Sequence, residues 1–70
     1  MLRVGTIVEW SWGNGTGRGR ITRIFREDVT RRIKGSSVTR KASAEDPAYL
    51  IEQDDGAEVL KSRSELSRAD

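Results

Sequence analysis

The sequence predicts an all-β fold: a small five-stranded barrel that ends in a short helical turn. Three observations support this prediction. Short segments with β-branched or aromatic residues at alternate positions recur along the chain, turn-forming residues separate them, and no long amphipathic helix pattern occurs. The length of 70 residues fits one domain, residues 1–70, in which closing the sheet would remove exposed strand edges.

The first predicted strand is TIVEWSW, residues 6–12. Val8, Trp10 and Trp12 share one face of it, and the residues between them share the other. The stretch GNGTG, residues 13–17, then supplies a hairpin turn, because Gly and Asn tolerate the positive φ that tight turns require.

The second predicted strand is RGRITRIFRED, residues 18–28. Its apolar residues do not alternate: Ile21 and Phe25 are expected on one face and Ile24 on the other. This loss of alternation indicates a bend or bulge, which a small sheet needs in order to curl into a barrel.

The middle of the chain is less regular. Residues 29–35 fit either a loop or a short strand, and residues 36–42 form the third predicted strand, with Val38 facing inward. SAEDP, residues 43–47, breaks that strand, because Ser and Asp form turns and Pro47 cannot donate to a ladder.

The last part of the chain predicts a second hairpin. AYLIEQ, residues 48–53, is the fourth predicted strand, DDG at residues 54–56 is the turn, and residues 57–62 are the fifth strand. A short helical turn follows, beginning at Ser62 or Ser64. The residues expected at the centre of the barrel are Val8, Trp10, Ile21 and Leu60.

The composition indicates how large a core to expect and in which compartment the protein is expected. Hydrophobic residues make up 34% of the chain, so we expect a thin core. The chain has no Cys, which fits a reducing cytoplasm, and no apolar run approaches the roughly 18 residues of a membrane span. The N-terminus also lacks the apolar stretch of a signal peptide. We therefore expect a monomeric, cytoplasmic protein that does not bind a membrane.

The charge is divided between the two halves of the chain. Residues 1–41 carry ten basic and three acidic side chains, a net charge of +7, whereas residues 42–70 carry three basic and eight acidic ones, a net charge of −5. Such a chain either presents a basic face to an anionic partner or lets its two halves neutralise each other.

The order of the segments resembles one known family. VGTIVEW, a glycine-rich stretch and GRITRI in the first half, and KASAEDPAYLIEQDDGAEVLKSRSEL in the second half, are similar to the hypervirulence-associated Tudor domain family over residues 3–67. The resemblance implies a Tudor-like, SH3-type barrel and little chemistry, because the family has no established molecular activity. Two stretches depart from the pattern expected of relatives: the hairpin loop, with its glycines, its arginines and Trp12, and FREDVTRR, residues 25–32.

The residue types argue against catalysis and cofactor binding. With no His and no Cys, the serines lack the usual general base and the chain lacks a thiolate nucleophile. The acidic pairs Glu45–Asp46 and Asp54–Asp55 lie in predicted turns, where adjacent carboxylates diverge, and they lack the spacing of a calcium loop. We therefore predict no enzyme activity, no cofactor and no metal site.

The glycine-rich stretch WSWGNGTGRGR, residues 10–20, is interpreted as structural. A phosphate-binding loop feeds glycine amides into a helix N-terminus, but these glycines lead into a strand. Gly17 and Gly19 are expected on one strand face, where they leave room for Trp10.

The predicted function is that of a non-enzymatic interaction module. A basic, aromatic-edged surface is expected to dock a partner protein or another polar or anionic partner, and its predicted residues are Trp12, Arg18, Arg20 and Tyr49.

Two other binding functions remain open from the sequence. One is direct nucleic-acid binding by a basic stripe made of Arg18, Arg20, Arg31, Arg32 and Lys34. The other is an aromatic cage for a methylated cation, in which the rings of Trp12 and Tyr49 would be joined by Glu45 or Asp46.

Overall fold

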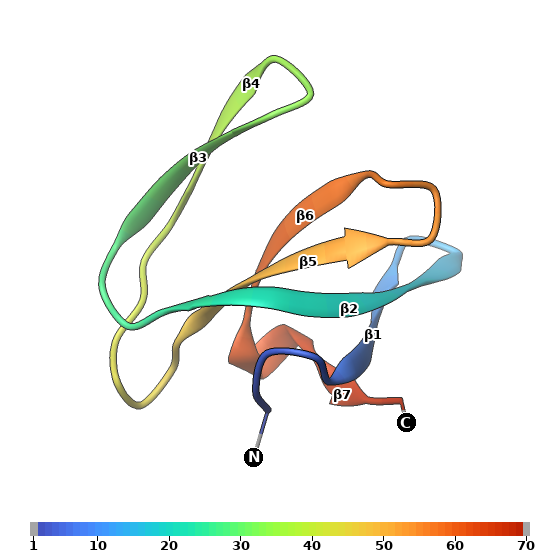
Figure 1. Cartoon of the computed structure of the whole chain (residues 1–70), viewed down its shortest axis with the longest axis horizontal. Coiled ribbons are helices and arrows are strands. Elements are labelled where there is room, and N and C mark those ends of the chain that lie inside the picture. The colour runs from blue at the N-terminus through green and yellow to red at the C-terminus, as the bar shows by residue number, and fades with distance from the viewer. Residues whose placement is uncertain (1, 70) are drawn as a thin grey trace.

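The structure is a computed structural model that describes residues 2–69. The elements in chain order are β1 (Ile7–Trp12), β2 (Gly15–Phe25), β3 (Val29–Ile33), β4 (Ser36–Arg40), β5 (Ala48–Gln53), β6 (Glu58–Ser62), the 3₁₀ turn η1 (Arg63–Glu65) and β7 (Ser67–Arg68). Figure 1 shows these elements along the chain. The predicted all-β class and C-terminal helical turn are both confirmed.

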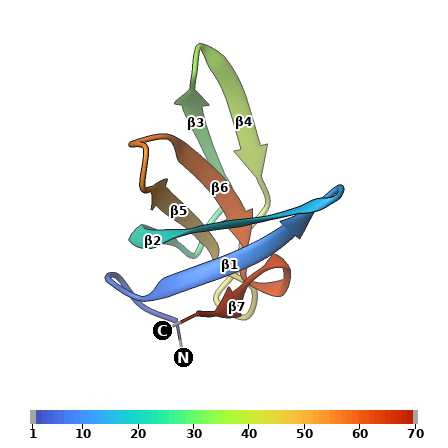
Figure 2. The ribbon, with the colours of Figure 1, turned by 90° about the vertical axis from the view of Figure 1, so that its right-hand side faces the viewer.

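The strands form two antiparallel sheets, and these sheets do not close into a barrel. One sheet has five strands in the order β6-β5-β2-β1-β7, and the other contains only β3 and β4. Figure 2 shows β3 and β4 rising as a separate hairpin beside β6. The prediction of one closed five-stranded barrel is therefore wrong, because within residues 2–69 this hairpin pairs only with itself.

A β-bulge in β2 sets the orientation of several side chains. Ile21 lies opposite Ile51 and Arg23 lies opposite Leu50, so Thr22 is an extra residue in β2. The Thr22 hydroxyl donates a hydrogen bond to the carbonyl oxygen of Leu50 at 3.2 Å. This bulge confirms the irregularity predicted for the second strand.

The bulge also changes which face each following residue occupies. Ile21 and Ile24 pack into the same hydrophobic cluster, whereas Phe25 packs against a different one. The expectation that Ile21 and Phe25 share a face is wrong, because one inserted residue shifts the alternation by one position.

Two hydrophobic clusters lie on opposite sides of β5. The buried residues of the first cluster are Val8, Trp10, Ile21, Tyr49 and Ile51. Those of the second cluster are Ala48, Leu50 and Leu60. Strand β5 contributes to both clusters, which is why residues 48–51 are buried without alternation. All four residues expected at the centre are buried, although Leu60 belongs to the second cluster.

The β3–β4 hairpin covers the second cluster. Val29, Ile33 and Val38 pack against it, so the inward orientation predicted for Val38 is confirmed. The two strands are joined by Lys34 and Gly35, whose φ angles of 51° and 79° are the positive values that a tight hairpin turn requires.

Glu65 fastens the C-terminal turn to the sheet. The backbone N–H of Ser62, the residue before η1, donates a hydrogen bond to Glu65 Oε1 at 2.9 Å. The carboxylate of Glu65 also forms ion pairs with Arg40 at 3.1 Å and with Lys61 at 3.9 Å. Of the two starting residues predicted for the helical turn, Ser62 and Ser64, the structure has Ser62.

Candidate functional site

Trp12 is an exposed aromatic side chain at the end of β1. Its side chain is 60% exposed, whereas Trp10, two residues earlier on the same face, is only 6% exposed. Trp12 lies opposite Gly15 in the β1–β2 ladder. A Cβ atom built on Gly15 would be 3.0 Å from Cζ2 of Trp12, so the indole lies flat against this glycine. The hairpin backbone therefore supports the exposed ring.

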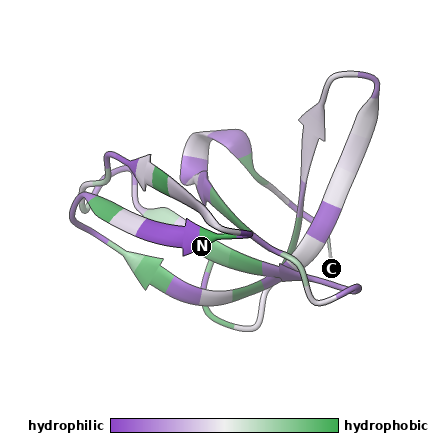
Figure 3. Cartoon of the chain, turned by 90° about the horizontal axis from the view of Figure 1, so that it is seen from above, coloured by the Kyte–Doolittle hydropathy of each residue, from purple (hydrophilic) through white to green (hydrophobic). Residues whose placement is uncertain are grey.

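The exposure of Trp12 follows from the length of the first hairpin. Strand β2 pairs with β5 only from Gly19 onward, so residues 15–18 pair with β1 alone. Figure 3 shows this end of the hairpin extending away from the rest of the chain, coloured white and purple rather than green. The row of inward-facing residues in β1 thus continues beyond the core, and Trp12 occupies the end of that row.

Arg18 and Arg20 lie on the opposite face of the same hairpin. Their partners in β1 are Glu9 and Ile7, which alternate with the buried residues of that strand. Because paired residues of an antiparallel ladder point to the same side, neither arginine shares a face with Trp12. The predicted union of these three side chains on one surface is therefore wrong.

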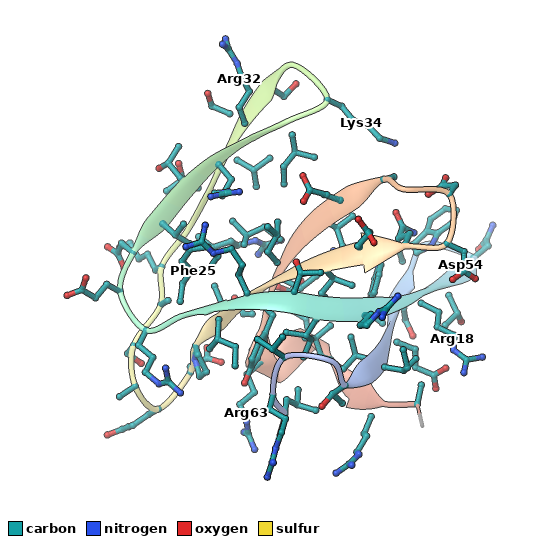
Figure 4. All side chains as sticks on the ribbon, viewed as in Figure 1. Arg18, Phe25, Arg32, Lys34, Asp54 and Arg63 are labelled. Carbon is teal, nitrogen blue, oxygen red and sulfur yellow. The ribbon has the colours of Figure 1, made fainter. Side chains whose placement is uncertain are left out.

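A shallow groove adjoins the two arginines. It has a volume of about 350 Å³, and acidic residues of β5 and the following turn, Glu52 and Asp54, complete its lining. Figure 4 shows Arg18 and Asp54 at the same end of the molecule. The acidic half of the chain thus lies beside this part of the basic half.

Tyr49 does not lie on the surface. It is 2% exposed and belongs to the first hydrophobic cluster, together with Trp10. The expectation that Tyr49 lines a rim near Trp12 is wrong, and these two rings form no open cage for a methylated cation. The uninterrupted apolar run AYLI, residues 48–51, is typical of a strand that is buried on both faces, and it could have indicated this burial.

The predicted basic stripe is not continuous. Arg31 and Arg32 lie on β3 and Lys34 lies in the following turn. Figure 4 shows Arg32 and Lys34 at the tip of the β3–β4 hairpin, far from Arg18. The five residues of the predicted stripe therefore form two separate groups.

A pair of arginines around Phe25 was missed by sequence reasoning. The guanidinium carbon of Arg23 lies 5.5 Å from the centroid of the Phe25 ring, and that of Arg31 lies 5.9 Å from it. Both separations are within the range of a cation–π contact. The spacing of Arg23 and Phe25 in one strand was a visible signal, but the contact with Arg31 depends on how the β3–β4 hairpin folds back.

Residues 2–69 contain no group of three or more His, Cys, Asp or Glu side chains placed to hold a metal ion. Within the same residues, no helix has the length and apolar character needed to cross a membrane. Three surface features of residues 2–69 carry exposed aromatic or charged side chains: the end of the first hairpin with Trp12, the mixed-charge groove beside Arg18 and Arg20, and the basic β3–β4 hairpin.

Comparison with known proteins gives one match. The family model described as the TUDOR domain of hypervirulence associated proteins matches residues 5–66 of the chain. No curated protein and no solved structure gives a significant match. The matched segment covers nearly the whole chain and contains every element from β1 to η1.

Proposed function

The chain belongs to the Tudor domain family of hypervirulence associated proteins, and we propose that it is a non-enzymatic module that docks a partner protein through the end of its first hairpin. Tudor domains are small β folds that serve as interaction modules. The residue types agree with a role in binding, since a chain without His and Cys lacks the usual bases and nucleophiles.

The observation that carries this proposal is the exposure of Trp12. A tryptophan left 60% exposed on a projecting hairpin loses the benefit of burial unless a partner covers it. Trp and Arg are the residue types that contribute most binding energy at protein interfaces. The indole lies against Gly15, so the surface left exposed is the side of the ring that a partner would cover.

The two faces of the hairpin define how a partner would bind. A protein that binds around the end of the hairpin contacts the indole of Trp12 on one face and the guanidinium groups of Arg18 and Arg20 on the other. We expect the indole to provide most of the binding energy and the exposed arginines to contribute mainly to the association rate.

Site-specific photo-crosslinking tests the proposal. A photoreactive phenylalanine analogue is placed at position 12, and in a matched control at position 4, because Val4 is the other large hydrophobic residue with most of its surface exposed among residues 2–69. In an extract of the source organism treated with nuclease, position 12 is expected to capture a defined protein that position 4 does not capture.

The captured protein then gives a quantitative test. Trp12→Ala is expected to weaken its binding by roughly 30-fold or more, which corresponds to a hot-spot contribution of about 2 kcal/mol. Val4→Ala should change the affinity less than about twofold. Equal labelling from the two positions, or unchanged affinity of Trp12→Ala, would contradict the proposal.

A further inference from the structure

The β3–β4 hairpin carries an unusually uniform charge. We name residues 29–41 the basic ribbon: they include no acidic side chain, and their five basic residues are Arg31, Arg32, Lys34, Arg40 and Lys41. Among residues 2–69, Arg40 is the only member of this set that forms an ion pair, and its partner is Glu65. The remaining positive charges of the basic ribbon have no carboxylate partner there.

The two faces of the basic ribbon differ in chemistry. The inner face packs its apolar residues on the second cluster. The outer face consists of Thr30, Arg32, Ser37 and Thr39, all exposed and all able to form hydrogen bonds. The hydroxyls of Thr30 and Thr39 lie 2.8 Å apart across the ladder. An outer face with four polar side chains and no apolar one is suited to a polar ligand.

The basic ribbon is held in place at its base and along its inner face. The backbone N–H of Ala42 donates a hydrogen bond to Asp28 Oδ1 at 3.0 Å, which joins the two chain segments at the base. Arg31 lies over the ring of Phe25, and Arg40 pairs with Glu65. In Figure 4, Arg32 points away from the body of the molecule at the projecting end. A ligand can therefore reach the outer face without moving the hairpin.

We propose that the basic ribbon binds double-stranded DNA by lying in the major groove with its outer face toward the base edges. A two-stranded ribbon has a strand spacing of about 4.8 Å, and with its side chains it fits a groove roughly 12 Å wide. Arginine and threonine are side chains that contact guanine and the thymine methyl group in that groove. Lys34 and Lys41 at the two ends of the basic ribbon lie where they can meet backbone phosphates.

The geometry favours DNA over two other polyanions. Duplex RNA has a deep, narrow major groove that excludes side chains, so the basic ribbon should discriminate against it. An acidic peptide could add as a strand to an edge of the hairpin. However, each edge offers the outward N–H and C=O groups of only two residues, Thr30 and Arg32 on β3 or Ser37 and Thr39 on β4.

Fluorescence anisotropy with a fluorescein-labelled 20-base-pair DNA duplex tests the proposal. With Lys34 and Lys41 at backbone phosphates, the logarithm of the binding constant should fall with the logarithm of the salt concentration at a slope of about −1.8. A duplex RNA of the same sequence should bind at least tenfold more weakly.

A matched pair of double variants locates the site. Arg32→Gln with Lys34→Gln removes one base-edge contact, worth at least about fivefold, and one phosphate contact, worth about eightfold at 0.1 M salt, so affinity should fall on the order of 40-fold or more. Arg18→Gln with Arg20→Gln removes the same charge from β2, and its affinity should change less than about threefold. All four residues are exposed, and circular dichroism checks that both variants fold.

The inference would be overturned if the wild-type chain did not bind the DNA duplex at 50 mM salt, or if the two double variants lost equal DNA affinity. It would also be overturned if duplex RNA bound with equal affinity, or if polyglutamate of equal charge displaced the DNA. The DNA and RNA comparison uses the unmodified chain, so it remains decisive if a variant does not fold. Trp12→Ala should bind DNA normally, which separates this site from the protein-docking site.

Discussion

Replacing Gly17 with alanine tests how the core is built around Trp10. The two residues lie opposite each other in the β1–β2 ladder, and a Cβ atom at Gly17 would meet the indole of Trp10 well within 3.0 Å. Trp10 is 6% exposed and packs in the first cluster, so its ring has little space into which it can move. The added methyl group must therefore displace either the indole or a strand.

The magnitude follows from the cost of overpacking a core. Forcing an extra carbon into a packed interior costs about 1–3 kcal/mol. A domain of this length has a total stability of about 3.5–10 kcal/mol. With a urea m-value of about 1 kcal/mol/M, Gly17→Ala should lower the midpoint of unfolding by roughly 1–3 M. The unfolding free energy is measured by circular dichroism during urea titration.

Gly15→Ala is the matched control for this prediction. Gly15 also lies under a tryptophan, but Trp12 is exposed and can rotate away from the new methyl group. Since alanine is favoured over glycine in a strand by about 0.5–1 kcal/mol, Gly15→Ala should unfold at the same urea concentration or a higher one. An unchanged midpoint for Gly17→Ala, or equal losses in both variants, would refute the packing described for Trp10.

Three further predictions concern elements described above. Glu65→Ala should lower the unfolding free energy by about 1 kcal/mol, and Glu65→Gln by less because the amide oxygen can still accept from Ser62; equal losses in urea titrations would contradict this. Deleting Thr22 should abolish the circular dichroism signal of the folded sheet, because each residue of β2 after the bulge would then point to the opposite face of the sheet. Thr22→Ser keeps the inserted residue and should fold. Trp10→Ala should lower the unfolding free energy by about 3–5 kcal/mol, and Trp12→Ala should lower it by less than about 0.5 kcal/mol. A lower melting temperature for Trp12→Ala than for Trp10→Ala would refute the assigned burial.

Local patterns predicted most of the strands, although the second predicted strand, residues 18–28, is displaced by three residues from β2, Gly15–Phe25. The fourth predicted strand, residues 48–53, has the same bounds as β5. The third predicted strand, residues 36–42, corresponds to β4, Ser36–Arg40. These features depend on β-favouring residues and on turn-forming residues that lie close together in the sequence. The bulge at Thr22 was also indicated locally, by apolar residues that fail to alternate.

The arrangement of the hairpins could not be predicted in the same way. Closure into a barrel depends on whether β3 or β4 forms hydrogen bonds with the five-stranded sheet, and no local pattern specifies that contact. The placement of Trp12 and Arg18 on opposite faces of the first hairpin, by contrast, could have been predicted. Once the turn fixes Trp12 opposite Gly15, the alternation of the ladder places Arg18 on the other face, so the sequence and one register would have been sufficient.

The position of the β3–β4 hairpin has a consequence for which changes of sequence this fold tolerates. Residues 29–41 form an excursion between β2 and β5, two strands that are direct neighbours in the sheet, and the Asp28–Ala42 hydrogen bond closes its base. Every ladder of the five-stranded sheet is formed without this excursion. Its tip can therefore be lengthened, or its outer face changed in sequence, without altering a hydrogen bond of that sheet, provided that its inner apolar residues continue to cover Leu50 and Leu60.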